Sequence, residues 1–300
     1  MSICARALDG ILLLDKPAGL TSNAALQRVK RLFRAKKAGH TGSLDPLATG
    51  MLPICFGEAT KFCQYVLDAD KCYETTGLLG VVTNTGDAMG TVISRVEHFS
   101  CPEDALLAVI PQFTGAIQQI PPMYSALKHH GKPLYAYARA GVTLERSPRL
   151  ITIHDLQVCA FDGRTMDLRV RCSKGTYIRS LVESIGETLG MGAHVTRLRR
   201  CYTAGFEQDP MFTLDALVQM SEEHLDACLL PMERTVSHLP CLVLEPDRVK
   251  KLRNGQVIDD CVASSLIGSV RLHDETAHFI GLGDLLSDGK LLAKRLLQMH

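Results

Sequence analysis

The sequence predicts an α+β fold with a smaller, β-rich unit at its C-terminal end. Residues 166–172 alternate apolar and charged side chains, which is the two-residue period of a half-buried strand. The segment 178–189 instead places its apolar residues on one face of a helix. Beyond the prolines at 231 and 240, the segments 279–283 and 290–295 flank Ser287-Asp288-Gly289, which is typical of a hairpin.

Each further element follows from a local pattern. The apolar run 10–14 is expected to form a buried strand, and the polar residues at 22 and 23 can cap a helix that runs to about residue 34. The loop 39–50 follows. The remaining expected elements are a helix over 58–67, a strand over 71–82, a turn over 84–87, a returning strand over 90–96 and a short helix over 134–140.

One helix start and one helix end have specific signals. Ser100 and Glu103 have the spacing of a capping box for the helix that follows them. Pro111 should end or kink that helix early, because proline lacks the N–H that a helix interior needs.

Composition limits the ways in which this chain can attract a partner. The 300 residues are 46% apolar, which is enough for a large core, and allow one large domain or two unequal ones. The net charge of +1 gives no overall field that would attract nucleic acid. Two local basic runs remain, with six Lys or Arg between 28 and 37 and three arginines between 197 and 200. Each can be a solvated helix face or a phosphate-binding surface.

The cysteines indicate a reducing compartment. The chain has eleven cysteines, an odd number, and none forms a C-x-x-C pair. We therefore expect free, mostly buried thiols and no metal site. The N-terminal apolar run is too short for a secretion signal, and no apolar run is long enough to span a membrane. These features predict a cytoplasmic protein.

The loop 39–50 is the most informative segment. It combines three glycines, a histidine and an aspartate in twelve residues. Glycines let the backbone approach a ligand closely, and Pro46 holds the preceding Asp45 in an extended conformation. The loop therefore presents a fixed carboxylate with His40 and a basic run beside it, which suggests chemistry on a nucleic acid. An Asp-Pro turn without any function would have the same local sequence.

Five blocks of sequence, in this order, resemble the TruB family of tRNA pseudouridine synthases. They cover residues 10–17, 39–61, 120–128, 172–179 and 192–200, and the longest reads GHTGSLDPLATGMLPICFGEATK. The resemblance extends from about residue 10 to 236 and is weaker beyond that point. A single G-x-x-D loop would be weak evidence, whereas five ordered blocks are strong evidence.

The resemblance implies a pseudouridine synthase fold, in which helices flank a central mixed, largely antiparallel sheet, followed by a small PUA-like β-barrel. The expected domains are a catalytic domain over 1–236 and a PUA-like RNA-binding domain over 237–300. The implied activity is isomerisation of uridine 55 in the T arm of tRNA, without metal or cofactor. tRNA is the expected partner, and the protein is expected to be a monomer.

The family assigns catalytic roles to three positions. Asp45 matches the essential aspartate, which attacks the ribose or the base, or removes the 2′ proton through a glycal route. Arg179 matches the arginine that pairs with it. A cation in the first turn of a helix is disfavoured by the helix dipole, and an anionic partner would resolve that conflict. Tyr73 matches the tyrosine that stacks on uracil and helps to remove the C5 proton.

The remaining matches concern substrate binding. His40 matches the histidine that fills the space left when the uridine flips out of its stack. Tyr177 and Leu198 match residues that line the uracil pocket. Lys16 and Lys174 are expected phosphate contacts, although ordinary surface lysines would look the same in sequence.

Two other functions remain open at this point. A non-catalytic tRNA-binding or folding factor could carry the same RNA-binding surfaces, although Asp45, Tyr73 and Arg179 argue against an exclusively binding role. A nucleoside hydrolase could use the same C1′ chemistry, and the sequence gives no clear marker for the exclusion of water.

Overall fold

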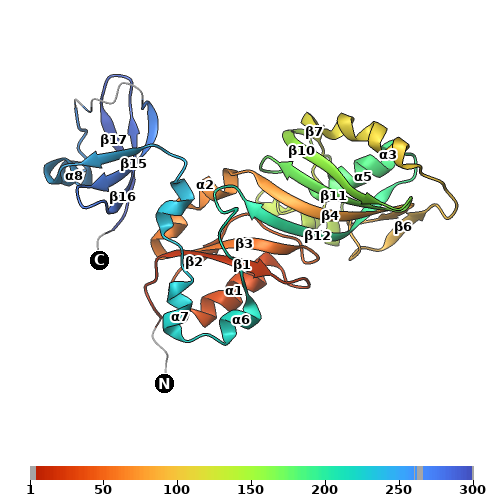
Figure 1. The fold of residues 1–300 in the computed structure, drawn as a ribbon, viewed down its shortest axis with the longest axis horizontal. Coiled ribbons are helices and arrows are strands. Elements are labelled where there is room, and N and C mark those ends of the chain that lie inside the picture. Colours follow the sequence, from red (N-terminus) through yellow and green to blue (C-terminus); the bar gives the residue numbers. More distant parts are fainter. Residues whose placement is uncertain (1–4, 260, 262–265, 299–300) are drawn as a thin grey trace.

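The computed structural model describes residues 5–259, 261 and 266–298, so the outermost residues of both predicted domains, 1–4 and 299–300, lie outside the described part. Most of the chain forms one nine-stranded sheet with the order β13-β1-β3-β12-β4-β11-β10-β7, and β2 pairs with β3 beside this path (Figure 1). The strands are β1 (Gly10–Lys16), β2 (Ala38–His40), β3 (Thr49–Phe56), β4 (Lys71–Leu79), β7 (Gly115–Gln119), β10 (Arg149–Phe161), β11 (Thr165–Cys172), β12 (Ala193–Thr203) and β13 (Phe212–Thr213).

Neighbouring strands of this sheet are mostly antiparallel. The antiparallel pairs are β1–β3, β2–β3, β4–β12, β4–β11, β10–β11 and β7–β10. The pairs β1–β13 and β3–β12 are parallel. The predicted mixed, largely antiparallel sheet of an α+β fold is therefore confirmed.

Helices and short hairpins surround the sheet. Figure 1 shows α1, α6 and α7 near β1 and β3, with α3 and α5 toward the other end of the sheet. The helices are α1 (Ser22–Leu32), η1 (Gly57–Phe62), α2 (Cys63–Asp68), α3 (Glu103–Val109), η2 (Ile110–Phe113), α4 (Leu134–Arg139), α5 (Ile178–Thr188), α6 (Leu214–Val218), α7 (Glu222–Ala227) and η3 (Met232–Val236). The hairpins are β5 (Val81–Thr83) with β6 (Val92–Arg95) and β8 (Lys128–His129) with β9 (Lys132–Pro133).

Helix α5 packs closely on the centre of the sheet. Leu181, Val182 and Ile185 are buried on its inner face. Gly77 of β4 makes this approach possible, because a Cβ atom there would lie 2.9 Å from Cγ1 of Val182 and 2.7 Å from Cε of Met166. The close packing fixes the start of α5, which carries Arg179, relative to the strands.

Several expected elements are present and others differ. The expected strands at 10–14 and 166–172 and the helices at 22–34 and 178–189 all form, within a few residues. The helix expected over 58–67 is divided into η1 and α2. The capping box was wrong, because the N-cap of α3 is Pro102 and no side chain caps it. Pro111 does end α3, and the chain continues there as the 3₁₀ helix η2.

The C-terminal unit forms a separate sheet with its own core. Its elements are β14 (Cys241–Leu244), α8 (Pro246–Arg253), β15 (Gly268–Asp274), β16 (Phe279–Leu285) and β17 (Leu291–Leu296), and the strand order is β14-β15-β16-β17. Leu252, Val270 and Leu272 are among its buried residues. The expected hairpin at this end is confirmed by the antiparallel pair β16–β17.

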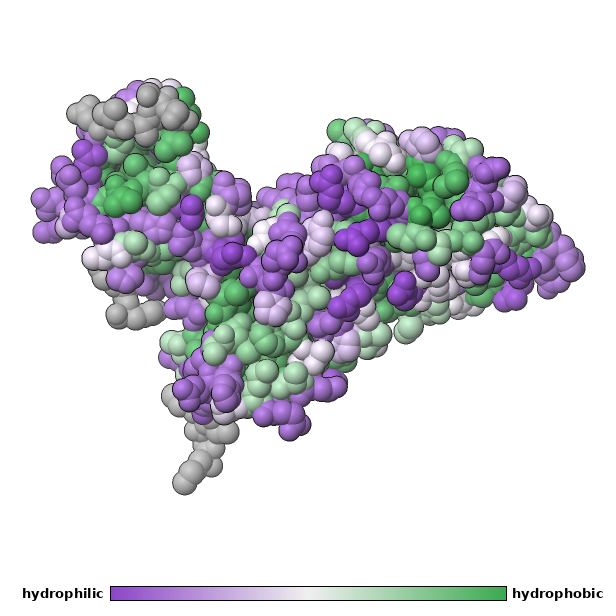
Figure 2. Space-filling model, in the orientation of Figure 1, coloured by the Kyte–Doolittle hydropathy of each residue, from purple (hydrophilic) through white to green (hydrophobic). Residues whose placement is uncertain are grey.

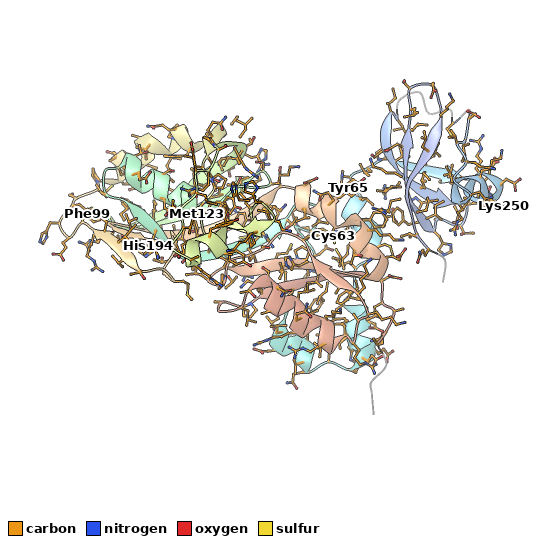
Figure 3. The ribbon with its side chains drawn as sticks, turned by 180° about the vertical axis from the view of Figure 1, so that it is seen from behind. Cys63, Tyr65, Phe99, Met123, His194 and Lys250 are labelled. Carbon is orange, nitrogen blue, oxygen red and sulfur yellow. The ribbon has the colours of Figure 1, made fainter. Side chains whose placement is uncertain are left out.

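A small apolar cluster joins the C-terminal unit to the rest of the molecule. Phe62 of η1, Val236 of η3 and Leu282 of β16 in the C-terminal unit are buried together. Figure 3 places Tyr65 at this junction, where its ring centroid lies 6.1 Å from that of His238. Figure 2 shows a notch between the two units that is bordered mostly by hydrophilic residues. Within the described residues, no helix is both long enough and apolar enough to cross a membrane.

Candidate active site

The loop that carries Asp45 connects β2 to β3 and is held at several points. The hydroxyl of Ser22 accepts a hydrogen bond from N of Leu44 at 2.7 Å and donates to its carbonyl at 3.0 Å. At the end of the loop, Gly50 has φ of +95°, and a Cβ atom there would lie 2.2 Å from the carbonyl oxygen of Arg200. A larger residue cannot be accommodated, so glycine lets β3 lie directly beside β12.

Asp45 and Arg179 form an ion pair in which both carboxylate oxygens take part. Nε of Arg179 lies 2.9 Å from Oδ2 of Asp45, and Nη2 lies 3.3 Å from Oδ1. The guanidinium is 3% exposed, and its other donors bind the carbonyl oxygens of Thr85 at 2.5 Å and Tyr124 at 2.7 Å. The predicted anionic partner in the first turn of α5 is therefore present.

The groups around Asp45 shift the pKa of its carboxyl in opposite directions. Burial raises the pKa of this carboxyl, and the neighbouring charge of Asp87 raises it further. Arg179 lowers the pKa through its charge and hydrogen bond, and Lys16 lowers it through its charge. Burial outweighs the cations, so the pKa of Asp45 lies above its usual value, and Arg179 is the main group that favours the charged form.

Tyr73 lies on β4, buried between the two neighbouring strands. It is opposite Val170 of β11 and Arg200 of β12. Burial raises the pKa of the Tyr73 hydroxyl, the hydrogen bond and charge of Arg200 lower it, and the charge of Asp45 raises it. The hydroxyl is therefore neutral near pH 7 and close enough to Asp45 to sense its charge.

Arg200 is a site residue that sequence reasoning missed. Its side chain is 1% exposed, Nε donates to the carbonyl of Met51 at 2.7 Å, and Nη2 donates to that of Gly42 at 2.9 Å. These acceptors lie on either side of Asp45, so Arg200 ties the two ends of its loop together while it contacts Tyr73. The alternation of residues 198–200 along a strand could have indicated one inward-facing arginine.

His40 lies near Arg200, and Leu198 packs in the same apolar cluster as Tyr73. The Nδ1 atom of His40 is buried without a hydrogen-bond partner among the described residues. Burial and the charge of Arg200 lower the pKa of His40, so the imidazole is neutral at pH 7. Leu198 is buried on β12 within the same apolar cluster as Tyr73.

Tyr177 precedes α5 and is fixed through its backbone. Its N–H donates to Oε1 of Gln119 at 2.8 Å, and its carbonyl accepts from Nε2 of the same side chain at 3.0 Å. Burial raises the pKa of its hydroxyl, and a hydrogen bond with Ser125 lowers it. The charges of Asp45 and Arg179 also act on this hydroxyl, so Tyr177 belongs to the same site.

The two lysines expected at phosphates have different environments. Lys174 is exposed and pairs with Asp68 at 2.9 Å, which leaves it at the surface as expected. Lys16 is fully buried, and Nζ donates to the carbonyls of Pro17 at 2.8 Å and Leu20 at 2.7 Å. Burial lowers the pKa of Lys16 to about 8. The amine of Lys16 is occupied by two backbone carbonyls in this structure, and a phosphate contact there stays a prediction.

The two basic runs also differ. Arg28, Arg31, Lys36 and Lys37 are exposed on and after α1. The run 197–200 lies on β12 and not on a helix. Two of its arginines pair with carboxylates, Arg199 with Asp15 at 2.9 Å and Arg197 with Asp167 at 3.7 Å, and the third is the buried Arg200. The second run is therefore mostly structural.

A cavity of about 760 Å³ is lined by residues that contact Arg179 or follow it on α5, but not by Asp45 or Arg179 themselves. Thr85 and Tyr124, whose carbonyls bind Arg179, line it together with Met123, which is labelled in Figure 3. Glu183 of α5 also lines it, and burial raises the pKa of that carboxyl to about 7. Among the described residues, no group of three or more His, Cys, Asp or Glu side chains is arranged to hold a metal ion.

Comparison with known proteins agrees with this geometry. Residues 30–178 match the family described as TruB family pseudouridylate synthase, N-terminal domain. Residues 179–237 match the tRNA pseudouridylate synthase B C-terminal domain, and 240–297 match the pseudouridine synthase II TruB C-terminal family.

Full-length relatives and solved structures are similar over almost the whole chain. A protein of Legionella pneumophila named tRNA pseudouridine synthase B is 53% identical, over 97% of this chain and 96% of that protein. One of Coxiella burnetii with the same name is 49% identical, over 98% and 96%. In the crystal structure of a Cbf5–Nop10–Gar1 complex, a chain superposes with a TM-score of 0.75 and 28% identity, over 97% of this chain and 85% of that one. The chain therefore belongs to the TruB family of pseudouridylate synthases.

Proposed function

We propose that this protein isomerises uridine 55 in the T arm of tRNA to pseudouridine. The observation that carries the proposal is the Asp45–Arg179 ion pair, in which a buried guanidinium holds the carboxylate of the loop 39–50. The names of the relatives support tRNA as the substrate. We further propose that residues 1–236 form the catalytic domain, that 237–300 form a PUA-like RNA-binding domain, and that the protein acts as a cytoplasmic monomer.

The reaction breaks the C1′–N1 bond of uridine, turns the uracil and joins C5 to C1′. It is neither oxidation nor hydrolysis, so the same atoms are present before and after it. Asp45 acts as an ionised group, either as nucleophile at the ribose or base or as the base that removes the 2′ proton. Arg179 favours the ionised form of this carboxyl and orients it through a two-pronged contact that lysine cannot make.

The later step requires loss of the proton on C5. We infer that Tyr73 stacks on the uracil and that its hydroxyl, whose raised pKa keeps it neutral, takes part in moving that proton. Arg200 supports this role because its charge and hydrogen bond lower the pKa of the Tyr73 hydroxyl against the larger effect of burial. Arg200 therefore positions both Tyr73 and the loop that carries Asp45.

Substrate binding requires the target base to leave its stack, at a cost on the order of a few kcal/mol. The neutral ring of His40 is suited to occupy the vacated space, and Tyr177 and Leu198 are suited to line the uracil pocket. The exposed cations of residues 28–37, with Lys174, are suited to contact phosphates.

Tritium release from tRNA labelled at C5 of uridine tests the proposal. Wild type should release tritium at one site per T arm, and Asp45→Asn should release none while it binds tRNA within a few-fold of wild type. Asp104→Asn, an exposed aspartate on α3, is the matched control and should behave as wild type. Tight binding with no release by wild type would instead favour the tRNA-binding or folding factor, and free uracil in the products would favour a hydrolase.

A further inference from the structure

Cys241, His273 and Glu233 form a hydrogen-bonded chain where the C-terminal unit begins. Sγ of Cys241 lies 2.7 Å from Nδ1 of His273, and Nε2 of His273 lies 3.0 Å from Oε1 of Glu233. In the parallel pair β14–β15, Cys241 is opposite Arg271 and Val243 is opposite His273. The two-residue period of strands therefore places the thiol and the imidazole on the same face of the sheet.

The three side chains have the arrangement of a nucleophile, its base and the group that orients the base. The carboxylate of Glu233 accepts only, so Nε2 of His273 carries the hydrogen and Nδ1 presents its lone pair to the thiol. Arg271 forms an ion pair with the same carboxylate and holds it in place. The ring of Phe279, whose centroid lies 5.7 Å from that of His273, packs beside the imidazole.

Cys241 and its base, His273, differ in their exposure to solvent. Cys241 is exposed, whereas His273 is 7% exposed. Among the ten cysteines that the structure describes, only Cys159 on β10 is exposed as well. Cys241 therefore lies at the surface, where a small disulfide can approach it, while the imidazole beside its partly buried thiol stays shielded from water.

The resting state of this thiol is protonated. Burial raises the pKa of Cys241, the charge of Glu233 raises it further, and Arg271 lowers it. The sulfur consequently becomes a nucleophile when its proton moves to His273, and not through a large standing population of thiolate. General-base assistance of this kind contributes only when the base already lies in hydrogen-bonding reach, as His273 does.

We propose that Cys241 is a modification site that forms mixed disulfides with small disulfides, with His273 as its base and Glu233 as the residue that positions the base. Sγ attacks one sulfur of the disulfide RS–SR, the S–S bond breaks, and a bond from Cys241 to one SR group forms. The second RS group leaves as a thiolate and takes the proton from His273. Cys241 is oxidised, and half of the small disulfide is reduced to RSH.

The test compares the two exposed cysteines within the same wild-type molecules. The full-length protein is incubated with oxidised glutathione at pH 7, quenched with acid, alkylated and digested, and the modified fraction at each cysteine is followed by mass spectrometry. Cys241 should react roughly tenfold or more faster than Cys159, because within the described part of the chain Cys241 is the one of these two with a base in hydrogen-bonding reach. Equal or slower reaction of Cys241 would overturn the proposal without any variant.

Variants then assign the roles. His273→Gln should slow Cys241 to about the rate of Cys159, while Glu233→Gln should shift the imidazole-dependent limb of the pH–rate profile to lower pH. Glu233 pairs with the imidazole and Arg271 pairs with the same carboxylate, so Glu233→Gln removes the anion and leaves the cation of Arg271 nearby. Circular dichroism and tritium release check that the variants are folded. A folded His273→Gln protein with an unchanged rate at Cys241, or an unshifted profile in Glu233→Gln, would refute these roles.

Discussion

Replacement of Arg179 by lysine tests whether the geometry of the ion pair matters beyond its charge. Arg179 makes three hydrogen bonds, one to Asp45 and one each to the carbonyls of Thr85 and Tyr124, and its Nε lies 2.9 Å from the second carboxylate oxygen of Asp45. Lysine keeps the positive charge but donates from a single nitrogen, so it cannot keep the two-pronged contact and both carbonyl contacts. A charge-only explanation predicts little change, whereas the geometry predicts a large one.

The magnitude follows from the contacts that are lost. One hydrogen bond to a carboxylate contributes roughly 1.5–3 kcal/mol, so turnover in Arg179→Lys should fall about ten- to a hundredfold. Two buried carbonyls without donors should together lower the free energy of unfolding by roughly 2–5 kcal/mol. Because Arg179 opposes the effect of burial on the pKa of Asp45, the acid limb of the pH–rate profile should also move to higher pH.

Single-turnover tritium release measures the chemical step, and urea unfolding measures stability. Arg171→Lys, on the exposed face of β11, is the control and should change the free energy of unfolding by less than about 0.5 kcal/mol. A folded Arg179→Lys protein with turnover within threefold of wild type would refute the argument from geometry.

Three further predictions concern the loop, the buried lysine and the basic run. Gly50→Ala should lower the free energy of unfolding by roughly 3–5 kcal/mol, since its Cβ would meet a carbonyl at 2.2 Å, whereas Gly205→Ala, with similar φ but open space, should cost about 1–2 kcal/mol. Equal losses in urea unfolding would contradict the steric explanation. The unfolded chain binds the Lys16 proton more tightly, because burial lowers the pKa from 10.5 to about 8. The full cost of burying a charged Lys16 therefore applies below pH 8. As the pH rises from 8 toward 10.5, the free energy of unfolding of wild type should increase by up to about 3 kcal/mol relative to Lys16→Met. A difference between the two proteins that does not change with pH would contradict this prediction. The double variant Lys36→Glu/Lys37→Glu should bind tRNA more weakly and with a shallower dependence on salt, by about two units of the log–log slope, and an unchanged slope would exclude phosphate contacts there.

Sequence patterns predicted the elements that carry their own periodic signal. The alternation along β11 and the apolar face of α5 were sufficient, because each needs only one buried side. Strand β3 was missed, since all but one of its residues are buried and it shows no alternation, and it also contains Pro53 and Gly50. Strand β12 was missed because its arginines resembled a solvated basic run.

Most residues of the candidate site could be predicted only because they match the motifs of the family. The ion pair between Asp45 and Arg179 followed from a cation at a helix start that needs an anion. The burial of Lys16 and Arg200 could not be predicted in this way, because both are stabilised by backbone carbonyls. Those of Lys16 come from the turn that follows it, and those of Arg200 come from a distant segment that the fold brings beside it. No local sequence pattern indicates a carbonyl acceptor.

The contacts of Arg179 have a consequence for which changes this site can tolerate over evolutionary time. Thr85 and Tyr124 present main-chain oxygens to the guanidinium, so their side chains can diverge without loss of either hydrogen bond. An inserted or deleted residue in either segment would move the oxygen itself. Sequence changes near this site should therefore be substitutions, whereas insertions and deletions should be confined to more distant turns.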